Sequence, residues 1–371
     1  MKTIKKVLVI GNNVRNIVCS ARKAGYIVHA IDRFGDIDMQ KCASKVHILE
    51  DIPENELEQL AGSFGDLDAV ILGPGFEHLK INNALNNSKE TMEAAGNKSK
   101  LPKKLHSLGI PHPETVSIDK ADGLGFPLIV KPKSGSGGMR NIIVRNEAEL
   151  NIFKKQKDPT YFIAQEFIEG IPCSASVIST GNEAVVVALN EQLIGIPWLT
   201  RLPFAYCGNI TPFHTKFSEE MVQYAKQIAL EFKLQGSNGV DFMLTDKGVQ
   251  VIEVNPRFQG SIDTIELSTR LSIFDAHIKS FDAELPGSHE PKCFAAKTIV
   301  YADKEVVIDK GISDVLIRYL NKGQAADIPR LGIKVLPDEP ITTVLATAMT
   351  RGMVLGKVEK SARHIKGSTE V

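Results

Sequence analysis

Short apolar runs alternate with amphipathic segments over the first 87 residues of the chain. The runs are rich in Val, Ile and Leu and predict β-strands, whereas the amphipathic segments have the apolar spacing of helices. We expect strands at residues 6–10, 26–31, 46–49 and 69–72, and helices at residues 14–24 and 54–61. Since right-handed crossovers join parallel strands, the pattern predicts an N-terminal domain of residues 1–87 built on a parallel sheet.

This N-terminal pattern resembles a Rossmann-like dinucleotide-binding domain. Asp32 follows Gly11 by about twenty residues, where an acid that binds a ribose would lie. The segment 11–15 lacks the G-x-G-x-x-G signature, however, so NAD is not favoured and Asp32 capping a strand is the alternative. Asp36 and the segment 73–77, which ends in Glu77, follow predicted strands at the sheet edge where open α/β sheets bind ligands.

A glycine-rich loop joins two strands in the middle of the chain. Helical patterns at residues 89–96 and 99–109 precede an apolar strand that carries Lys131 at its end, and a further strand is expected at 142–144. A P-loop would instead run from Gly-Lys-Ser/Thr into a helix. We expect the backbone N–H groups of the loop to wrap phosphates, with Lys131 as a point charge beside an α- or β-phosphate. The loop comprises Ser134, Gly135, Ser136, Gly137 and Gly138. A plain glycine linker is the alternative interpretation.

A predicted strand at residues 161–167 ends in a mixed polar and apolar segment before Gly170. Such a strand end can hold an adenine, with the backbone groups of residues 166–168 reading its edge. The candidate residues are Gln165, Glu166, Phe167, Ile168 and Glu169.

Four polar residues cluster on a predicted β-hairpin that spans residues 239–257. A G1 bulge at Gly248 is expected to place Asp241 opposite Glu253, with Asn255 on the same face and Arg257 next to it. These oxygens suit Mg²⁺, which takes a few carboxylate ligands and completes its shell with water and phosphates. A surface hairpin with solvated charges is the alternative, but Glu253 lies between two apolar neighbours, where a lone charge is costly.

The last 81 residues, 291–371, predict a small closing domain. Strands are expected at residues 295–301 and 305–308, and a helix at residues 342–349. The polar end of the chain is expected to be frayed.

Composition narrows the choice of partners and compartment. The 44 basic and 44 acidic residues balance, so nucleic acid and anionic membranes are not favoured and small molecules are. No apolar run is long enough for a membrane span. Five cysteines are scattered singly, which predicts neither a zinc site nor a disulfide and favours a reduced, cytoplasmic location. They are Cys19, Cys42, Cys173, Cys207 and Cys293.

The order of these motifs resembles the ATP-grasp superfamily, in particular its branch with biotin carboxylase and the carbamoyl phosphate synthetase large subunit. Lys98 and Lys131 are similar to the two ATP lysines of that family, and residues 166–168 are similar to its adenine hinge. Asp241, Glu253 and Asn255 match its metal ligands, and Arg257 matches its phosphate-binding arginine. The resemblance implies ATP bound with two Mg²⁺, or Mn²⁺ as the alternative metal. It also implies an α/β and α+β multidomain fold in which an ATP-grasp domain of residues 88–290 has a mobile lid at about residues 112–168.

The resemblance also implies a reaction. A carboxylate attacks the γ-phosphate of ATP, and an amine or similar nucleophile captures the resulting acylphosphate, with Lys131 and Arg257 as the catalytic cations. Ser261 stands where biotin carboxylase has its catalytic glutamate, which disfavours bicarbonate chemistry. Carboxyphosphate-forming carboxylases and non-catalytic nucleotide-binding regulators are therefore the alternatives. Arg201, in a long polar loop, is a candidate partner for the substrate carboxylate. A homodimer is compatible with an ATP-dependent ligase of this kind.

Overall fold

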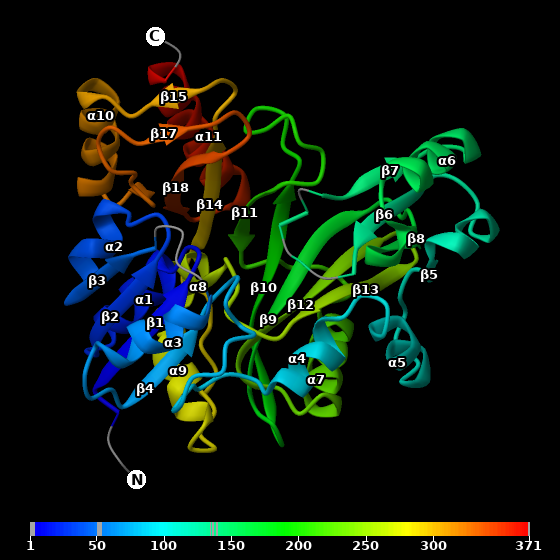
Figure 1. The fold of residues 1–371 in the computed structure, drawn as a ribbon, viewed down its shortest axis with the longest axis horizontal. Coiled ribbons are helices and arrows are strands. Elements are labelled where there is room, and N and C mark those ends of the chain that lie inside the picture. Colours follow the sequence, from blue (N-terminus) through cyan, green and yellow to red (C-terminus); the bar gives the residue numbers. More distant parts are fainter. Residues whose placement is uncertain (1–3, 50–53, 134, 136, 139, 370–371) are drawn as a thin grey trace.

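The computed structural model describes residues 4–49, 54–133, 135, 137–138 and 140–369. Its N-terminal part is a parallel sheet in the order β3-β2-β1-β4, as the sequence predicts (Figure 1). The strands are β1 (Lys6–Gly11), β2 (Ile27–Asp32), β3 (Lys45–Ile48) and β4 (Ala69–Leu72), and the helices are α1 (Arg15–Lys23), α2 (Ile37–Cys42) and α3 (Glu54–Gly62). Strands β1 and β4 are buried along almost their whole length, which explains their continuous apolar runs.

An eight-stranded sheet forms the centre of the molecule, in the order β13-β12-β9-β10-β11-β14-β18-β16. Its strands are β9 (Ile171–Thr180), β10 (Ala184–Ile194), β11 (Tyr206–Thr211), β12 (Gln235–Thr245), β13 (Gly248–Asn255), β14 (Phe294–Tyr301), β16 (Ala325–Ala326) and β18 (Pro340–Ala348). Helix α7 (Ser218–Glu231) packs on β9 and β10, while α8 (Ile262–Thr269) packs on β14 and β11. Helix α9 (Ile273–Ser280) packs on β12 and reaches α1, so the central and N-terminal sheets share one apolar core.

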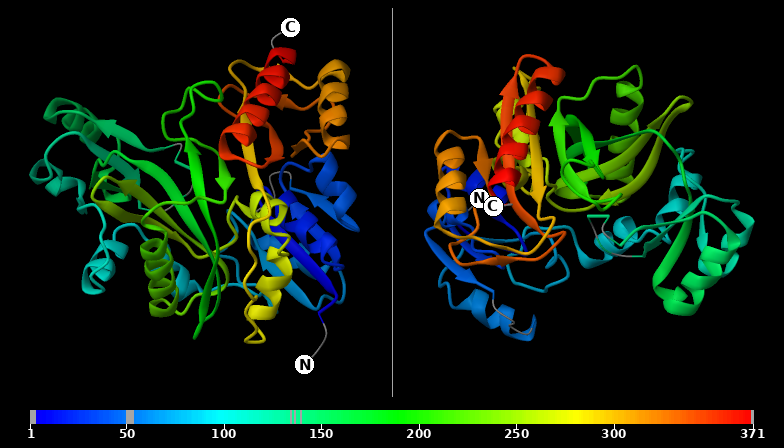
Figure 2. Two further views of the ribbon diagram at one scale, coloured as in Figure 1. Left: turned by 180° about the vertical axis from the view of Figure 1, so that it is seen from behind. Right: turned by 90° about the horizontal axis from the view of Figure 1, so that it is seen from above.

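A smaller four-stranded sheet, β5-β8-β6-β7, projects from the far end of the molecule. It and the N-terminal sheet lie at opposite ends in both views of Figure 2. The strands are β5 (Thr115–Ser117), β6 (Leu128–Pro132), β7 (Ile142–Val144) and β8 (Phe162–Glu166), with α6 (Glu147–Gln156) and the short 3-10 helices 118–123 and 159–161. Helices α4 (Lys89–Gly96) and α5 (Leu101–Ser107) connect this unit to the N-terminal sheet.

The C-terminal residues extend the central sheet. Strands β14, β18 and β16 belong to it, and β15 (Val306–Val307) pairs with β17 (Lys334–Val335) beside α10 (Lys310–Asn321). The predicted helix at residues 342–349 is wrong, because this β-branched segment pairs along its length with β14. The predicted frayed end is also wrong. Residues 351–368 form α11 (Arg351–Ser368), whose buried positions Val354, Val358, Ala362 and Ile365 recur at helical spacing.

Two of the cysteines form a disulfide, so the prediction of five single thiols is wrong. Cys19 on α1 and Cys42 at the end of α2 are bonded, with Cα atoms 5.2 Å apart. Cys173, Cys207 and Cys293 are free. The packing of α2 along α1 brings the pair together, and a spacing of 23 residues gives no local signal of it. The cysteine pattern therefore no longer supports a reducing compartment.

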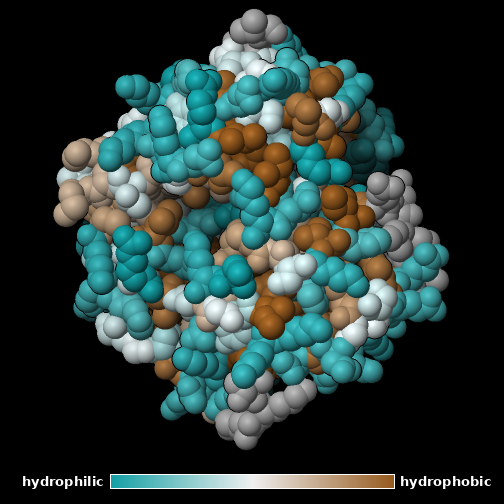
Figure 3. Space-filling view, turned by 90° about the vertical axis from the view of Figure 1, so that its left-hand side faces the viewer, coloured by the Kyte–Doolittle hydropathy of each residue, from teal (hydrophilic) through white to brown (hydrophobic). Residues whose placement is uncertain are grey.

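The outer face of the N-terminal and C-terminal elements is covered mainly by hydrophilic residues, interrupted by apolar patches (Figure 3). Among the residues that the structure describes, no helix is both long and apolar enough to cross a membrane.

Candidate functional site

A cavity of about 650 Å³ lies between the small sheet and the hairpin β12–β13 of the central sheet, a volume in the range of small-molecule sites. Most of the residues selected from the sequence line it. They are Lys98, Lys131, Gly135, Gly137, Gly138, Gln165, Glu166, Phe167, Ile168, Asp241, Glu253, Asn255 and Arg257. Ser134 and Ser136 lie outside the described residues. Glu169 is exposed and is not part of the lining.

The hairpin pairs Asp241 with Glu253, as expected, and brings Asn255 to the same site. The register irregularity is at Asp241/Phe242, however, whereas Gly248 pairs regularly with Thr245. The predicted bulge at Gly248 is therefore wrong in its position. The extra residue is Ile252, which lines the cavity beside Glu253.

Asp241 and Glu253 hold two carboxylates close together in a partly buried position. Asn255 Nδ2 donates to Asp241 Oδ2 at 2.9 Å and to Glu253 Oε1 at 3.4 Å, and Gln192 Nε2 donates to Asp241 Oδ1 at 2.9 Å. Burial and the neighbouring Glu253 charge raise the pKa of Asp241. A site that penalises its own negative charge in this way favours an added cation.

The donor set fits Mg²⁺ with help from other ligands. In the described part of the chain, no three His, Cys, Asp or Glu side chains gather closely enough to hold a metal ion. Two carboxylates, an amide oxygen, water and nucleotide phosphates nevertheless make up a common magnesium shell. The Asn255 amide presents its nitrogen to the carboxylates here, so it would have to turn over to offer its oxygen to a metal.

Lys98 lies across the carboxylates in the position of a counter-ion. Its Nζ is 2.8 Å from Glu253 Oε2 and donates to Gly135 O at 2.9 Å, so it connects the hairpin to the glycine-rich loop. Although burial by itself raises the pKa of Glu253, the Lys98 ammonium outweighs it and lowers that pKa. Glu253 therefore stays ionised and available to a cation.

Lys131 on β6 is almost fully buried in the cavity wall, with 4% of its surface exposed. Burial lowers the pKa of Lys131 to about 8, although the Glu253 carboxylate opposes the shift. A desolvated ammonium gains more from an anionic partner than a solvated one does, which suits a phosphate-binding lysine.

Arg257 reaches the cavity from the end of β13 and is anchored there by the N-terminal sheet. Its Nε is 2.7 Å from Glu77 Oε1, and Glu77 Oε2 accepts the N–H of Gly75 at 2.9 Å. The loop after β4, which the sequence marked as a ligand-binding edge, therefore contributes to this site through Glu77 and the lining residue Pro74.

The end of β8 forms the other wall. Gln165 is buried, and its Nε2 donates to Thr115 Oγ1 at 2.8 Å, so its side chain supports β5. Phe167 and Ile168 line the cavity together with Ile129 and Met243, two apolar residues that the sequence reasoning missed. An apolar slot beside backbone groups is suited to a nucleobase.

The glycine-rich loop lies against the start of β11 and the residues just before it. Gly137 O accepts the N–H of Tyr206 at 3.4 Å. Gly138 has φ +70°, and a Cβ added to it would come within 2.0 Å of Phe204 O. Only glycine allows this approach of two backbones. Arg140, which the sequence reasoning also missed, follows the loop and lines the cavity.

The far end of the cavity is lined by neutral hydrogen-bonding groups, which include Tyr206, Asn209, Gln259 and Ser261. Tyr206 and Asn209 are bonded to each other, with Tyr206 Oη donating to Asn209 Oδ1 at 2.9 Å. Arg201 is not among the lining residues. It is exposed and lies 3.9 Å from Asp303, so the structure does not support its expected contact with a substrate carboxylate.

Asp32 caps the N-terminal sheet. Its carboxylate accepts the N–H groups of Val14, Phe34 and Gly35 at 2.9, 2.9 and 2.6 Å. These bonds satisfy its oxygens locally, which favours the capping interpretation over ribose binding.

The chain is similar to known proteins along its whole length. Residues 95–261 match the family described as ATP-grasp domain. An uncharacterized protein of Methanocaldococcus jannaschii is 28% identical over 97% of this chain and 93% of its own length. The arginine-specific carbamoyl phosphate synthase large chain of Geobacillus stearothermophilus is 24% identical over 60% of this chain, which spans only 22% of that protein. The resemblance inferred from the motifs is therefore confirmed.

Solved structures share the fold. The biotin carboxylase domain of Hydrogenobacter thermophilus 2-oxoglutarate carboxylase has a TM-score of 0.75, 18% identity, and coverage of 97% of this chain and 90% of that one. The N5-carboxyaminoimidazole synthetase of Staphylococcus aureus has a TM-score of 0.75, 18% identity, and coverage of 98% of this chain and 98% of that one. The L-amino acid ligase of Bacillus licheniformis has a TM-score of 0.71, 18% identity, and coverage of 97% of this chain and 98% of that one. The predicted fold class, a parallel-sheet N-terminal domain followed by an ATP-grasp fold, is confirmed.

Proposed function

The chain carries an ATP-grasp domain, and from this premise we propose that it is an ATP-dependent ligase that joins a small carboxylate to an amine or similar nucleophile. The carboxylate would be activated as an acylphosphate at a site with two Mg²⁺. The observation that carries the proposal is the set of cations and carboxylates around one cavity, with Lys98 bound to Glu253, Lys131 buried beside them and Arg257 next to Asn255.

Each of these groups has a role in the proposed reaction. Bound Mg²⁺ would neutralise the ATP phosphates, and Asp241, Glu253 and Asn255 are the residues that would hold it. Lys98 would leave Glu253 for a phosphate oxygen, since a metal replaces its charge there. Lys131 would bind a second phosphate, and Arg257 would exchange Glu77 for the phosphoryl group that moves. Phosphoryl transfer depends on such positioning and charge neutralisation, so no nucleophilic side chain is needed.

The similar proteins include both carboxylases and ligases, so two types of reaction have to be compared. The carbamoyl phosphate synthase and biotin carboxylase similarities would suit a carboxyphosphate-forming carboxylase. Ser261 argues against it, because Ser261 Oγ lies 3.1 Å from Ser176 Oγ and the cavity wall offers no carboxylate base at that point. The protein named L-amino acid ligase has the same fold, and a ligase that acts on amino acids fits the first proposal.

We further propose that the chain divides into domains of residues 1–87, 88–290 and 291–371, with residues 112–168 as a lid over the nucleotide. Magnesium is named with ADP in the Hydrogenobacter structure, and nothing supports Mn²⁺. That structure is a dimer, which makes a homodimer a reasonable state to test here. We also keep a cytoplasmic location, where ATP is supplied, although a disulfide is unusual there.

A release assay tests the proposal. The protein is incubated with Mg·ATP and a panel of carboxylates that includes the twenty amino acids, with and without amines, while bicarbonate is supplied in a separate arm. We expect ADP and phosphate to appear when a suitable carboxylate is present together with an amine, which is either added or carried by the amino acid itself. Turnover with bicarbonate alone would contradict the ligase and favour the carboxylase. ATP binding without turnover in any arm would favour a regulatory protein.

Glu253→Gln is the most direct variant for the metal assignment. It removes the charge that Lys98 and the metal share, so we expect turnover to fall by about a hundredfold or more while the fold is kept. Turnover and thermal unfolding are measured together. Glu219→Gln, at an exposed position at the start of α7, is the matched control. A fully active Glu253→Gln protein would remove the metal assignment.

A further inference from the structure

The turn formed by Gln259, Gly260 and Ser261 walls the far end of the cavity and is held from two sides. From β9, Ser176 Oγ donates to Gln259 Oε1 at 3.0 Å and lies 3.1 Å from Ser261 Oγ. From β14, Lys297 Nζ donates to Gly260 O at 2.9 Å. Lys297 and Ser176 are both buried and neither lines the cavity, so both support the turn from the protein interior.

Lys297 and Arg15 meet at Asp263, in the first turn of α8. Lys297 Nζ is 3.4 Å from Asp263 Oδ2. Arg15, on α1, binds the same carboxylate with both terminal nitrogens, at 2.5 Å to Oδ1 and 2.8 Å to Oδ2. Although burial alone raises the pKa of Asp263, the Arg15 guanidinium holds it well below the usual range, so the carboxylate is ionised.

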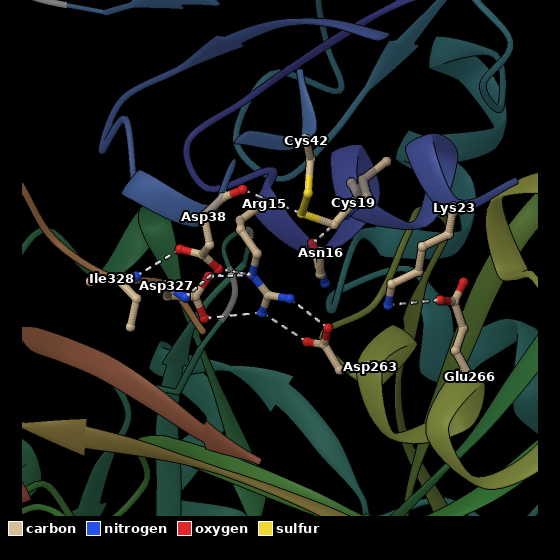
Figure 4. Close-up of a disulfide and its surroundings, with 11 residues drawn as sticks. Arg15, Asn16, Cys19, Lys23, Asp38, Cys42, Asp263, Glu266, Asp327 and Ile328 are labelled. Atoms are coloured by element: carbon tan, nitrogen blue, oxygen red, sulfur yellow. Dashed lines mark hydrogen bonds and ion pairs between the residues drawn. A yellow bond between two sulfur atoms is a disulfide. The ribbon is translucent and has the colours of Figure 1, made fainter. Parts of the chain in front are cut away.

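The same guanidinium extends the connection to the C-terminal part of the chain. Arg15 Nε and Nη2 donate to the Asp327 carboxylate at 2.8 and 3.1 Å (Figure 4). Asp38 on α2 accepts the N–H groups of Asp327 and Ile328 at 3.0 and 2.9 Å. The Cys19–Cys42 bond joins α1 to α2 beside this cluster. One arginine thus fixes the N-terminal sheet, α8 and the C-terminal segment relative to one another.

The energetic character of the cluster points to a positioning role. Burying several charges costs free energy, and well-packed apolar side chains of similar volume are often as stabilising or more so. Hydrogen bonds and ion pairs are directional, whereas apolar packing is not. A buried polar cluster can therefore hold a cavity wall in one fixed orientation. Lys297 in particular satisfies a carbonyl that belongs to the wall itself.

We propose that the carboxylate substrate occupies the far end of the cavity, and that Lys297 and Arg15 are positioning residues that act through Gly260 and Asp263 to fix the Gln259–Ser261 turn against it. The kinetic effects expected from this proposal rest on the proposed function. Neither residue touches the nucleotide end of the cavity, so their loss weakens use of the carboxylate and leaves nucleotide binding intact.

The test compares Lys297→Met, which keeps the length of the side chain, with Lys297→Arg, which keeps the charge. Lys334→Met removes an exposed lysine that pairs with Glu305 and serves as the control. We expect Lys297→Met to raise the KM for the active carboxylate of the release assay about tenfold, with kcat and the KM for ATP changed about twofold or less. Lys297→Arg should restore most of the loss. Equal increases in both KM values, or no rescue by arginine, would overturn the proposal.

A second measurement does not depend on turnover. Hydrogen exchange of the amides in residues 258–263 should become faster in Lys297→Met, whereas exchange in β12 and binding of fluorescent Mg·ADP should not change. Arg15→Lys, which loses the bidentate contact and keeps the charge, should give the same effect even if Lys297→Met does not fold. Unchanged exchange in residues 258–263 of both variants would contradict the positioning role, even if no carboxylate supports turnover.

Discussion

His277 provides a quantitative test of how the core behind the cavity is built. Its ring is buried between Phe258, at 4.4 Å between ring centroids, and Phe281. Nδ1 accepts the N–H of Ser237 at 2.9 Å, and Nε2 lies 3.0 Å from Leu85 O, to which it donates. Burial lowers the pKa of His277 from 6.5 to about 4. The folded protein therefore keeps this imidazole neutral, with Nδ1 as an acceptor.

Acidification should destabilise the protein through this residue. Below pH 6.5 the imidazole of His277 is protonated in the unfolded chain but stays neutral in the native protein. The stability that depends on the neutral ring is therefore fully present above pH 6.5 and is lost as the pH falls towards 4. From pH 7 to pH 5 the loss amounts to about 2 kcal/mol, and it levels off at about 3 kcal/mol once the pH is below 4.

The measurement is chemical denaturation of the wild type and of His277→Gln at both pH values. Gln keeps a donor for Leu85 but does not titrate. Buried carboxylates such as Asp32, whose pKa burial raises to about 6, shift stability in the opposite direction and equally in both proteins. The change in unfolding free energy from pH 7 to pH 5 is compared between the two proteins, and the difference isolates the contribution of His277. We expect this difference to be about 2 kcal/mol. The same pH change in both proteins would refute the reasoning.

Three further predictions concern the cavity and the disulfide. Lys131→Met should weaken binding of fluorescent Mg·ATP about tenfold or more, because a desolvated cation is lost. Lys133→Met is its control, and equal affinities of the two variants would contradict the role of Lys131 in phosphate binding. Gly138→Ala places a Cβ against Phe204 O and should raise the KM for ATP, whereas Gly123→Ala, with nothing within 4 Å, should not; a normal KM in Gly138→Ala would mean that the two backbones do not meet. Replacing Cys19 and Cys42 by Ser should lower the free energy of unfolding by about 3 kcal/mol. Denatured, unreduced protein should titrate three thiols, and five would show that the bond does not form.

The sequence predicted the elements whose signals are local. Strand β1 and helix α1 follow from apolar periodicity, and the β12–β13 hairpin follows from two β-branched runs around a turn with Gly248. The order of Lys98, Lys131 and the hairpin acids along the chain resembles that of the ATP-grasp family, and this resemblance predicted the cavity that they share.

What the sequence did not predict depends on contacts between distant residues. Strand β18 has a composition that suits a helix or a strand, and only its pairing with β14 decides. Arg15 and Asp263 are separated by 248 residues, so nothing local marks them as partners. Arg201 shows the reverse error, since a basic residue in a polar loop looks like a ligand but lies outside the cavity.

The central claim is that a carboxylate oxygen attacks the γ-phosphate of ATP, and isotope transfer tests it most directly. Amino acids labelled with ¹⁸O in their carboxylates are incubated with the protein, Mg·ATP and hydroxylamine as the nucleophile, and the phosphate is examined by mass spectrometry. We predict a hydroxamate, ADP and phosphate that carries one ¹⁸O atom from the carboxylate. A hydroxamate formed with unlabelled phosphate, or with AMP and pyrophosphate in place of ADP, would contradict the acylphosphate mechanism.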